Sequence, residues 1–331
     1  MLSRLYSKFK KFIKNNYIYM LIILTVVVVF VIPVPYYIDA PGGLINLNEK
    51  IFVKDKKNSE GSFNLTYVSE MKGNVFTFLT SIFDKNWDAI PNSENENSNG
   101  GALRNKLLLD NSLNNAYYVA NSYLNRDIKV KNTSIYVVYT DLDSDTDLSI
   151  GDIILEVDGR EISSLEDYSS VVNSKSVGDK ISIKVKNSEK EKYAVVKENN
   201  KKNSTLIYLL KNNEYDMSDV TFKFKDNESG SSGGLMMALS IYNQLTDFDL
   251  TNGLKIAGTG TISEDGSVGE ISGIKYKIVG AGENDADIFL VPKENYIEAK
   301  EVKKINGYKM QLVSVETFSD AIKFLTEYKK Q

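Results

Sequence analysis

The most informative stretch of this chain reads NESGSSGGLMMALSIYNQL and runs from Asn227 to Leu245. Its glycines and serines lead directly into an apolar segment with helical spacing, so the pattern predicts a tight turn followed by a buried helix. Ser232 then lies near the helix N-terminus, where backbone N–H groups lack acceptors and the helix dipole is positive. The backbone at Ser231 and Gly233 could therefore stabilise an oxyanion beside a Ser232 nucleophile. A Gly/Ser-rich turn that only caps a helix is the alternative interpretation.

A second segment, from Gly269 to Gly282, reads GEISGIKYKIVGAG and places a lysine among apolar residues. Read as a helix, it puts Lys277 on the same face as Ile274, Ile278 and Ala281. Because burying an ammonium group is costly, such a site would lower the pKa of the lysine from about 10.4 toward neutrality and make the amine a usable general base. Alternatively, the aliphatic stem of Lys277 is buried and its amine reaches water.

The composition excludes several kinds of catalytic site. The 331 residues include no cysteine and no histidine, which rules out disulfides, thiolate or imidazole zinc sites, cysteine nucleophiles and Ser-His-Asp triads. Acid–base chemistry must therefore use Lys, Asp, Glu or Tyr. No G-x-x-x-x-G-K-[ST] phosphate loop occurs, so we expect no nucleotide, cofactor or metal. Beyond residue 16, 35 basic residues oppose 44 acidic ones, which is not the charge balance of a nucleic-acid-binding protein.

The first 38 residues have the pattern of a membrane anchor. Residues 1–16 carry five basic side chains and no acid, and Tyr17 to Ile38 is a run of 22 residues without a charge. As a helix, this run would extend roughly 33 Å and match a bilayer core of about 30 Å. The positive flank predicts a cytoplasmic tail at 1–16, a single transmembrane helix at 17–38 of the cell membrane, and an extracellular catalytic part. A cleaved signal peptide is the alternative, although its apolar region should be shorter.

The segment 45–125 contains a strand-like part and a helix-like part. Residues 62–82 alternate and are rich in β-branched and aromatic residues, which predicts a hairpin that turns near Lys72 and Gly73. Residues 91–101 are polar and predict a loop. Residues 102–124 have apolar residues at helical spacing and predict a helix.

Residues 126–212 change to a pattern of short strands with one helical stretch, SLEDYSSVVNS. The stretch LSIGDIILEVDG, from Leu148 to Gly159, resembles the turn-strand-turn element of a bacterial-type PDZ domain. Such a domain has a sheet edge beside a helix, where an extended peptide can add a strand. The four acidic residues at positions 141, 143, 145 and 147 resemble the start of a calcium loop, but Thr146 stands where that loop needs glycine. We therefore interpret them as a solvated acidic loop.

The segments around Ser232 and Lys277 together resemble the proteolytic domain of the Lon family of serine peptidases, which uses a Ser-Lys dyad. GSSGG at 230–234 matches the family's G-P-S-A-G element, which implies Ser232 as the nucleophile. ISGIKYK at 271–277 matches I-G-G-x-x-x-K, which implies Lys277 as the general base. A family threonine that holds the lysine amine is matched by Thr259, in the strand-like KIAGTGTI.

The departures from the family motifs are few. Ser231 replaces proline, Gly233 replaces alanine and Ser272 replaces the first glycine, and all three changes exchange small residues. Ser229 stands where the ATP-dependent members often have aspartate, so no carboxylate-assisted step is carried over from them. The resemblance covers about 218–325, within an expected Lon-type proteolytic domain at 213–331.

The order of anchor, PDZ domain and Lon-type domain resembles the membrane-anchored PDZ-Lon-like peptidases of Gram-positive bacteria. The resemblance implies an α+β fold with a single N-terminal transmembrane helix and a PDZ domain inserted in the proteolytic domain, to which residues 45–125 contribute. It also implies an ATP-independent serine endopeptidase that cleaves exported peptides or unfolded segments, with the PDZ domain binding or gating substrate. Proteolytic domains of this family tend to form homo-oligomeric rings.

Two other functions are compatible with parts of the pattern. A catalytically silent membrane scaffold would use the PDZ domain to bind C-terminal peptides, but it would have little reason to keep a lysine on a buried stripe. A Ser-Lys enzyme of the signal-peptidase type would need its serine close behind the membrane span, and Ser232 lies far from that span.

Overall fold

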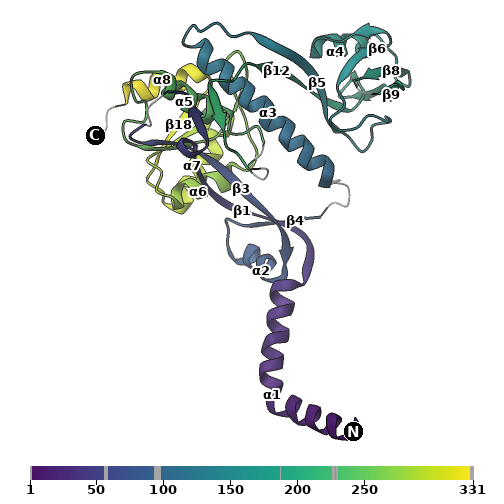
Figure 1. Cartoon of the computed structure of the whole chain (residues 1–331), viewed down its shortest axis with the longest axis vertical. Helices are drawn as coiled ribbons and strands as arrows, with labels where there is room; N and C mark the ends of the chain where they lie inside the picture. The colour runs from purple at the N-terminus through teal and green to yellow at the C-terminus, as the bar shows by residue number, and fades with distance from the viewer. Residues whose placement is uncertain are drawn as a thin grey trace.

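The computed structural model describes all residues except 1, 56–58, 93–97, 187, 226, 227, 229 and 329–331, and the side chains of 2, 3, 98 and 99 are also outside the description. The chain begins with the long helix α1 (Leu2–Val31), which extends away from the remainder of the molecule (Figure 1). Within the described residues, one helix, over Arg4–Val31, is long and apolar enough to cross a membrane by length and composition.

A six-stranded mixed sheet forms the centre of the main domain, in the order β18-β17-β14-β3-β1-β4. Its N-terminal strands are β1 (Pro33–Asn46), β3 (Ser62–Asn74) and β4 (Asp88–Pro91), and its C-terminal strands are β14 (Lys255–Gly258), β17 (Ile288–Pro292) and β18 (Gln311–Val315). The two groups meet where β3 pairs in parallel with β14, Phe63 lying opposite Ile256. One sheet is therefore built from segments that lie on both sides of residues 126–212 in the sequence.

Helices cover both faces of this sheet. The alternation of strand side chains sends Ile256, Ile288 and Leu290 into a core shared with α3 (Ser98–Ser122), α5 (Gly234–Leu245) and α8 (Phe318–Glu327). The alternate residues, such as Phe289 and Val291, enter a second core with α6 (Ile274–Glu283) and α7 (Tyr296–Asn306). Helices α5 and α6 therefore lie on opposite faces of the sheet.

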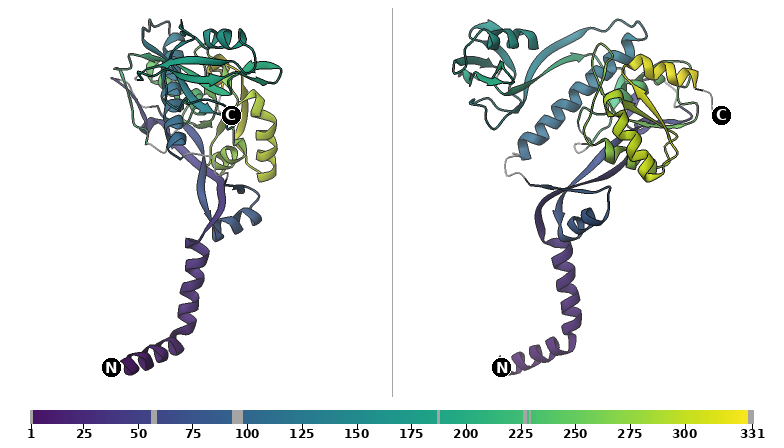
Figure 2. Two further views of the ribbon diagram at one scale, coloured as in Figure 1. Left: turned by 90° about the vertical axis from the view of Figure 1, so that its right-hand side faces the viewer. Right: turned by 180° about the vertical axis from the view of Figure 1, so that it is seen from behind.

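The inserted domain has its own core. A four-stranded sheet in the order β7-β6-β8-β9 packs with α4 (Leu165–Asn173). Its strands are β6 (Ile154–Val157), β7 (Arg160–Glu161), β8 (Lys180–Val185) and β9 (Lys192–Val195). A long ribbon of β5 (Val130–Thr140) and β12 (Ile207–Tyr215) joins this domain to the main one. In every view the inserted domain lies far from α1 (Figure 2).

The remaining elements are short: η1 (Leu47–Glu49), β2 (Ile51–Val53), α2 (Val75–Phe83), β10 (Lys197–Asn199), β11 (Lys202–Ser204), β13 (Val220–Phe222), β15 (Thr261–Ile262), β16 (Val268–Gly269) and η2 (Lys293–Asn295). The helix expected at 102–124 is α3, and it begins earlier, inside the expected 91–101 loop, of which residues 93–97 lie outside the described part.

The prediction of a hairpin at 62–82 is wrong. Residues 62–74 form the single strand β3, and the chain then enters α2, whose capping box joins Asn74 and Thr77. The antiparallel partner of β3 is the preceding strand β1. Gly73 does not form a turn. It lets β3 approach β1 closely, because a Cβ there would lie 2.8 Å from the Tyr36 carbonyl oxygen.

The bounds expected for the membrane helix, 17–38, also differ from those observed. Helix α1 ends at Val31, and Pro33 begins β1. Proline lacks the N–H that a helix needs and disfavours helical geometry in the residue before it, so Pro33 and Pro35 redirect the chain into a strand. Residues 33–44, outside the expected 45–125 segment, therefore belong to the main sheet.

Candidate active site

Ser232 lies in the turn that leads into α5. Gly233 is the N-cap of this helix, and no side chain caps it. A Cβ on Gly234 would lie 2.6 Å from the Ile262 side chain, and one on Gly233 would lie 2.8 Å from Leu65. A Cβ on Gly234 would also lie 2.9 Å from the Ile262 backbone nitrogen, so the turn is packed too closely for a larger residue there, whereas the atoms nearest to Gly233 are the flexible ends of side chains.

The backbone around Ser232 offers free donors. The Ser232 carbonyl oxygen accepts the N–H of Gly260 at 2.7 Å, and the Ser231 carbonyl oxygen accepts the N–H of Gly234 at 3.3 Å. Within the described part of the chain, the N–H groups of the expected donors Ser231 and Gly233, and that of Ser232 between them, have no hydrogen-bond acceptor. Unpaired N–H groups at a helix N-terminus are suited to bind an oxyanion.

Lys277 lies in the first turns of α6 and is buried, with 4% of its surface exposed. Desolvation by burial lowers the pKa of its amine from 10.5 to about 8. The positive end of the helix dipole acts in the same direction. The side chain therefore does not reach bulk water in the way that the alternative interpretation required. A substantial fraction of Lys277 is neutral near pH 8, as a general base requires.

Thr259 connects the lysine with the serine segment. The Lys277 amine donates to Thr259 Oγ1 at 3.1 Å, and the Thr259 hydroxyl donates to the Ser232 carbonyl oxygen at 2.9 Å. Thr259 is 1% exposed, and its own N–H donates to the Leu290 carbonyl oxygen. Since the threonine is held at both its backbone and its side chain, it sets the direction of the lysine amine.

Ser232 and Lys277 line the same cavity, which has a volume of about 800 Å³. Among the described residues, no direct hydrogen bond joins Ser232 Oγ to the Lys277 amine, and catalytic hydrogen bonds are often long before substrate binds. Residues of β1 and β3 form another wall of the cavity, and Met237 and Leu65 supply apolar surface beside Gly233. The sequence did not predict the wall from β1 and β3, because a hairpin within 62–82 was expected in place of the pairing of these two strands.

Lys50 and Glu228 form an ion pair in the cavity wall. The Lys50 amine lies 2.8 Å from both carboxylate oxygens of Glu228, and the two side chains are only 14% and 15% exposed. Burial acts to raise the pKa of Glu228, but the hydrogen bond from Lys50 opposes it and holds this pKa below its ordinary value. The pair ties the loop before Ser232 to the end of η1. No local pattern predicts it, because the partners are 178 residues apart. Ser229, in the same loop, lies outside the described residues.

We expect Glu228→Gln to lower kcat/KM about tenfold by loosening the loop before Ser232, because a hydrogen bond to a charged group contributes about 1.5–3 kcal/mol. Peptide cleavage by Glu228→Gln, Lys50→Met and the double variant should show strong coupling between the two positions. The exposed Glu60 supplies the control variant Glu60→Gln, for which kcat/KM should not change. Additive effects of Lys50→Met and Glu228→Gln would contradict a shared role.

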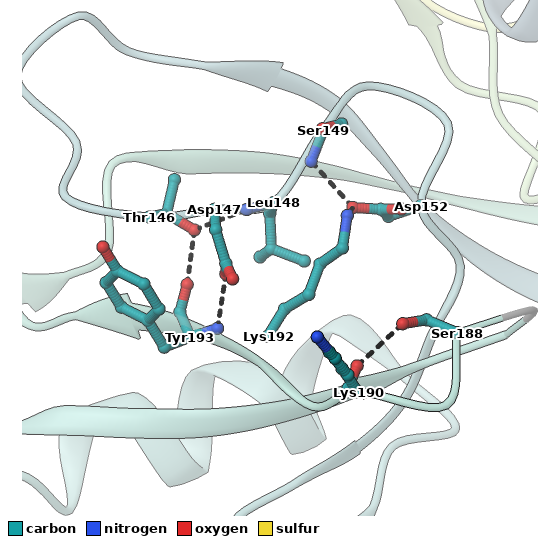
Figure 3. A network of polar contacts seen from close by, with 9 residues as sticks. All are labelled: Thr146, Asp147, Leu148, Ser149, Asp152, Ser188, Lys190, Lys192 and Tyr193. Carbon is teal, nitrogen blue, oxygen red and sulfur yellow. Dashed lines mark hydrogen bonds and ion pairs between the residues drawn. The ribbon is translucent and has the colours of Figure 1, made fainter.

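The acidic loop of the inserted domain has structural partners (Figure 3). Asp147 accepts the N–H of Tyr193 at 2.7 Å, and Asp152 accepts the N–H of Ser149 at 2.7 Å and the Lys192 amine at 2.6 Å. These carboxylates hold the loop against β9. Across the described residues, no group of three or more acidic side chains is arranged to hold a metal ion.

Comparison with known proteins identifies two domains in the sequence. A family model described as the Lon protease (S16) C-terminal proteolytic domain matches residues 164–327, and a PDZ domain model matches residues 122–197. The chain therefore contains a Lon-type proteolytic domain and a PDZ domain in an α+β fold.

Curated relatives agree with the first of these matches. The Lon protease of Campylobacter jejuni is 28% identical over 116 residues, which cover 34% of this chain and 14% of that protein. The Lon protease of Neorickettsia sennetsu is 27% identical over 122 residues, again covering 34% and 14%. The chain thus spans about one-seventh of the length of these relatives.

Among solved structures, the PDZ domain of an SdrC-like protein from Listeria monocytogenes is 27% identical. The match covers 25% of this chain and 93% of the solved chain, with a TM-score of 0.21.

Proposed function

We propose that this chain, with its PDZ domain and Lon-type proteolytic domain, is an ATP-independent serine endopeptidase anchored in the cell membrane by α1. Its catalytic part lies outside the cell and cleaves exported peptides or unfolded segments with a Ser232–Lys277 dyad. The observation that carries the proposal is the buried Lys277, whose pKa is lowered to about 8 and whose amine shares a cavity and a threonine link with Ser232.

The reaction uses groups already in place. Neutral Lys277 takes the hydroxyl proton of Ser232, and the Ser232 oxygen attacks the peptide carbonyl carbon. The backbone N–H groups of Ser231, Ser232 and Gly233 are available to stabilise the resulting oxyanion. The protonated Lys277 gives its proton to the leaving amine, and water then hydrolyses the acyl-enzyme. Thr259 keeps the lysine amine directed at the serine segment.

The PDZ domain supplies a second peptide site in this proposal. A cavity of about 510 Å³ lies between α4 and the segment 202–209, with Tyr168, Val172 and Leu209 in its lining. A groove beside a helix, lined here by apolar and polar side chains alike, suits the side chains of an extended peptide. The site would bind or gate substrates before they reach the cavity at Ser232.

The direct test incubates the full chain, in lipid nanodiscs, with a pool of short unstructured peptides and identifies products by mass spectrometry. We expect internal cleavage without ATP and little cleavage of compact folded proteins. Peptide binding by the PDZ domain without any cleavage would support the silent scaffold instead.

The pH dependence of cleavage reports on Lys277. Because the base must be neutral and its pKa is about 8, kcat/KM should rise about tenfold per pH unit below pH 8 and level off above it. The measurement is kcat/KM for one peptide from pH 5.5 to pH 9.5, with thermal unfolding followed in the same buffers. A flat profile in which chemistry is rate-limiting would contradict Lys277 as the base.

A further inference from the structure

Helix α2 carries an exposed apolar face, formed by Phe76, Leu79, Ile82 and Phe83. These side chains are 46%, 44%, 60% and 86% exposed, respectively. Three of them, with Thr80, Asp84 and Lys85, line a shallow groove. Contiguous exposed apolar surface of this kind marks a contact with a protein or a membrane.

The α2 face adjoins the end of α1. The rings of Phe30 in α1 and Phe76 in α2 stack with centroids 4.9 Å apart, and the Asn74 side-chain amide donates to the Phe30 carbonyl oxygen at 3.1 Å. The rings of Tyr36, just after α1, and Phe78 in α2 also pack together, with centroids 4.8 Å apart. Figure 1 shows α2 beside the point where α1 joins the main domain. If α1 spans a bilayer, α2 therefore lies at the bilayer surface.

The chemistry of α2 is compatible with lipid. The helix, VFTFLTSIF, contains no charged residue. Each of its hydroxyl groups is hydrogen-bonded within the helix or its cap: Thr77 to Asn74, Thr80 to Phe76, and Ser81 to Phe78. Polar groups that are satisfied internally carry little penalty on leaving water, so the helix can enter the acyl boundary without unpaired hydroxyl groups.

Basic and aromatic residues border the α2 face. The Lys85 amine donates to the Ile305 carbonyl oxygen at 3.3 Å, so the end of α7 lies beside α2. Lys85, Lys304 and Ile305 are all exposed there. Trp87 lies four residues beyond the end of α2, immediately before β4. Basic residues favour anionic headgroups, and tryptophan favours the membrane interface.

We propose that α2 lies in the interfacial region of the bilayer that α1 enters, with its apolar face at the acyl boundary. This inference rests on the proposed membrane anchor. It adds a second attachment that fixes the orientation of the main domain, because β3 runs from α2 directly to the cavity wall. Residues 66–74 of this strand span at most about 26 Å, so the Ser232 cavity stays within that distance of the α2 contact.

The test uses the only tryptophan of the chain, Trp87, as a depth probe. The full chain is placed in nanodiscs whose phospholipid acyl chains carry bromine near the headgroup, deep in the bilayer, or not at all. Bromine quenches tryptophan at short range. We expect loss of Trp87 emission with brominated lipid, greater for the shallow position than for the deep one.

Two variants complete the experiment. The double variant Ile82→Ser and Phe83→Ser should show clearly less quenching while α1 keeps it in the nanodisc. Leu142→Ser, at a residue of the inserted domain that is 70% exposed, should be quenched like the wild type. If the chain stays in the lipid fraction but Trp87 is not quenched, as when a second copy of the chain covers α2, the inference about α2 is wrong and the membrane anchor is unaffected. The same conclusion follows if the double variant is quenched as strongly as the wild type. A chain absent from the lipid fraction would overturn the membrane anchor and this inference together.

Discussion

Ser232→Ala is expected to reduce peptide cleavage by a factor of about 10⁴ or more, because removal of the nucleophile of a catalytic unit leaves only binding and oxyanion stabilisation. The fold should be unaffected, since the turn before α5 depends on the close packing of Gly233 and Gly234 and not on the Ser232 hydroxyl. The measurement is kcat/KM for a peptide identified from the pool, together with thermal unfolding of the same preparations.

The control for this loss is Ser218→Ala, a change at an exposed serine whose cleavage should match the wild type. Cleavage retained by Ser232→Ala would show that another group attacks the peptide bond, or that a contaminating peptidase was measured. A parallel loss of thermal stability would mean that the serine supports the fold.

Lys277→Met is expected to abolish cleavage and, below pH 8, to stabilise the protein. A pKa lowered from 10.5 to about 8 means that the charged, buried amine costs roughly 3 kcal/mol of folding free energy. Methionine has similar length and no charge, so the free energy of unfolding at pH 7 should rise by up to about 3 kcal/mol.

The pH dependence of this stabilisation has a defined sign. Between pH 8 and pH 10.5 the unfolded chain binds more protons at Lys277 than the folded chain, so wild-type stability rises with pH there. The advantage of Lys277→Met should shrink across that window and vanish above it. Denaturant unfolding at pH 7 and pH 10 measures this.

The matched control is Lys275→Met in the same helix. Lys275 pairs with Asp88 at 2.5 Å, so this variant should lose stability and keep its cleavage activity. A destabilised Lys277→Met would indicate that the lysine is paired in the folded state, contrary to the structure.

Local patterns predicted much of the site and of the inserted domain. The turn and helix around Ser232, the buried face that holds Lys277, and the strands and helix of the PDZ domain are all contained in short segments. In such segments, glycine placement and apolar spacing are physical causes of the structure. The role of Thr259 came from the family resemblance, and the structure locates its side chain between Lys277 and the Ser232 carbonyl oxygen.

The largest errors fall in residues 33–82. Their apolar and β-branched residues fit a membrane helix or a hairpin equally well when the segment is considered alone. The outcome depends on pairing of β1 with β3 and of β3 with β14, which lies almost 200 residues away in the sequence. No window of local sequence contains that partner.

The types of residue, their periodicity, the absence of cysteine and histidine, and the order of the segments follow from the sequence, because each depends on neighbours along the chain. The shared cavity of Ser232 and Lys277, the Lys50–Glu228 pair and the position of α2 against α1 follow from the tertiary structure. These features join distant segments, and their geometry is set by the packing of helices on both faces of one sheet, which local patterns do not encode.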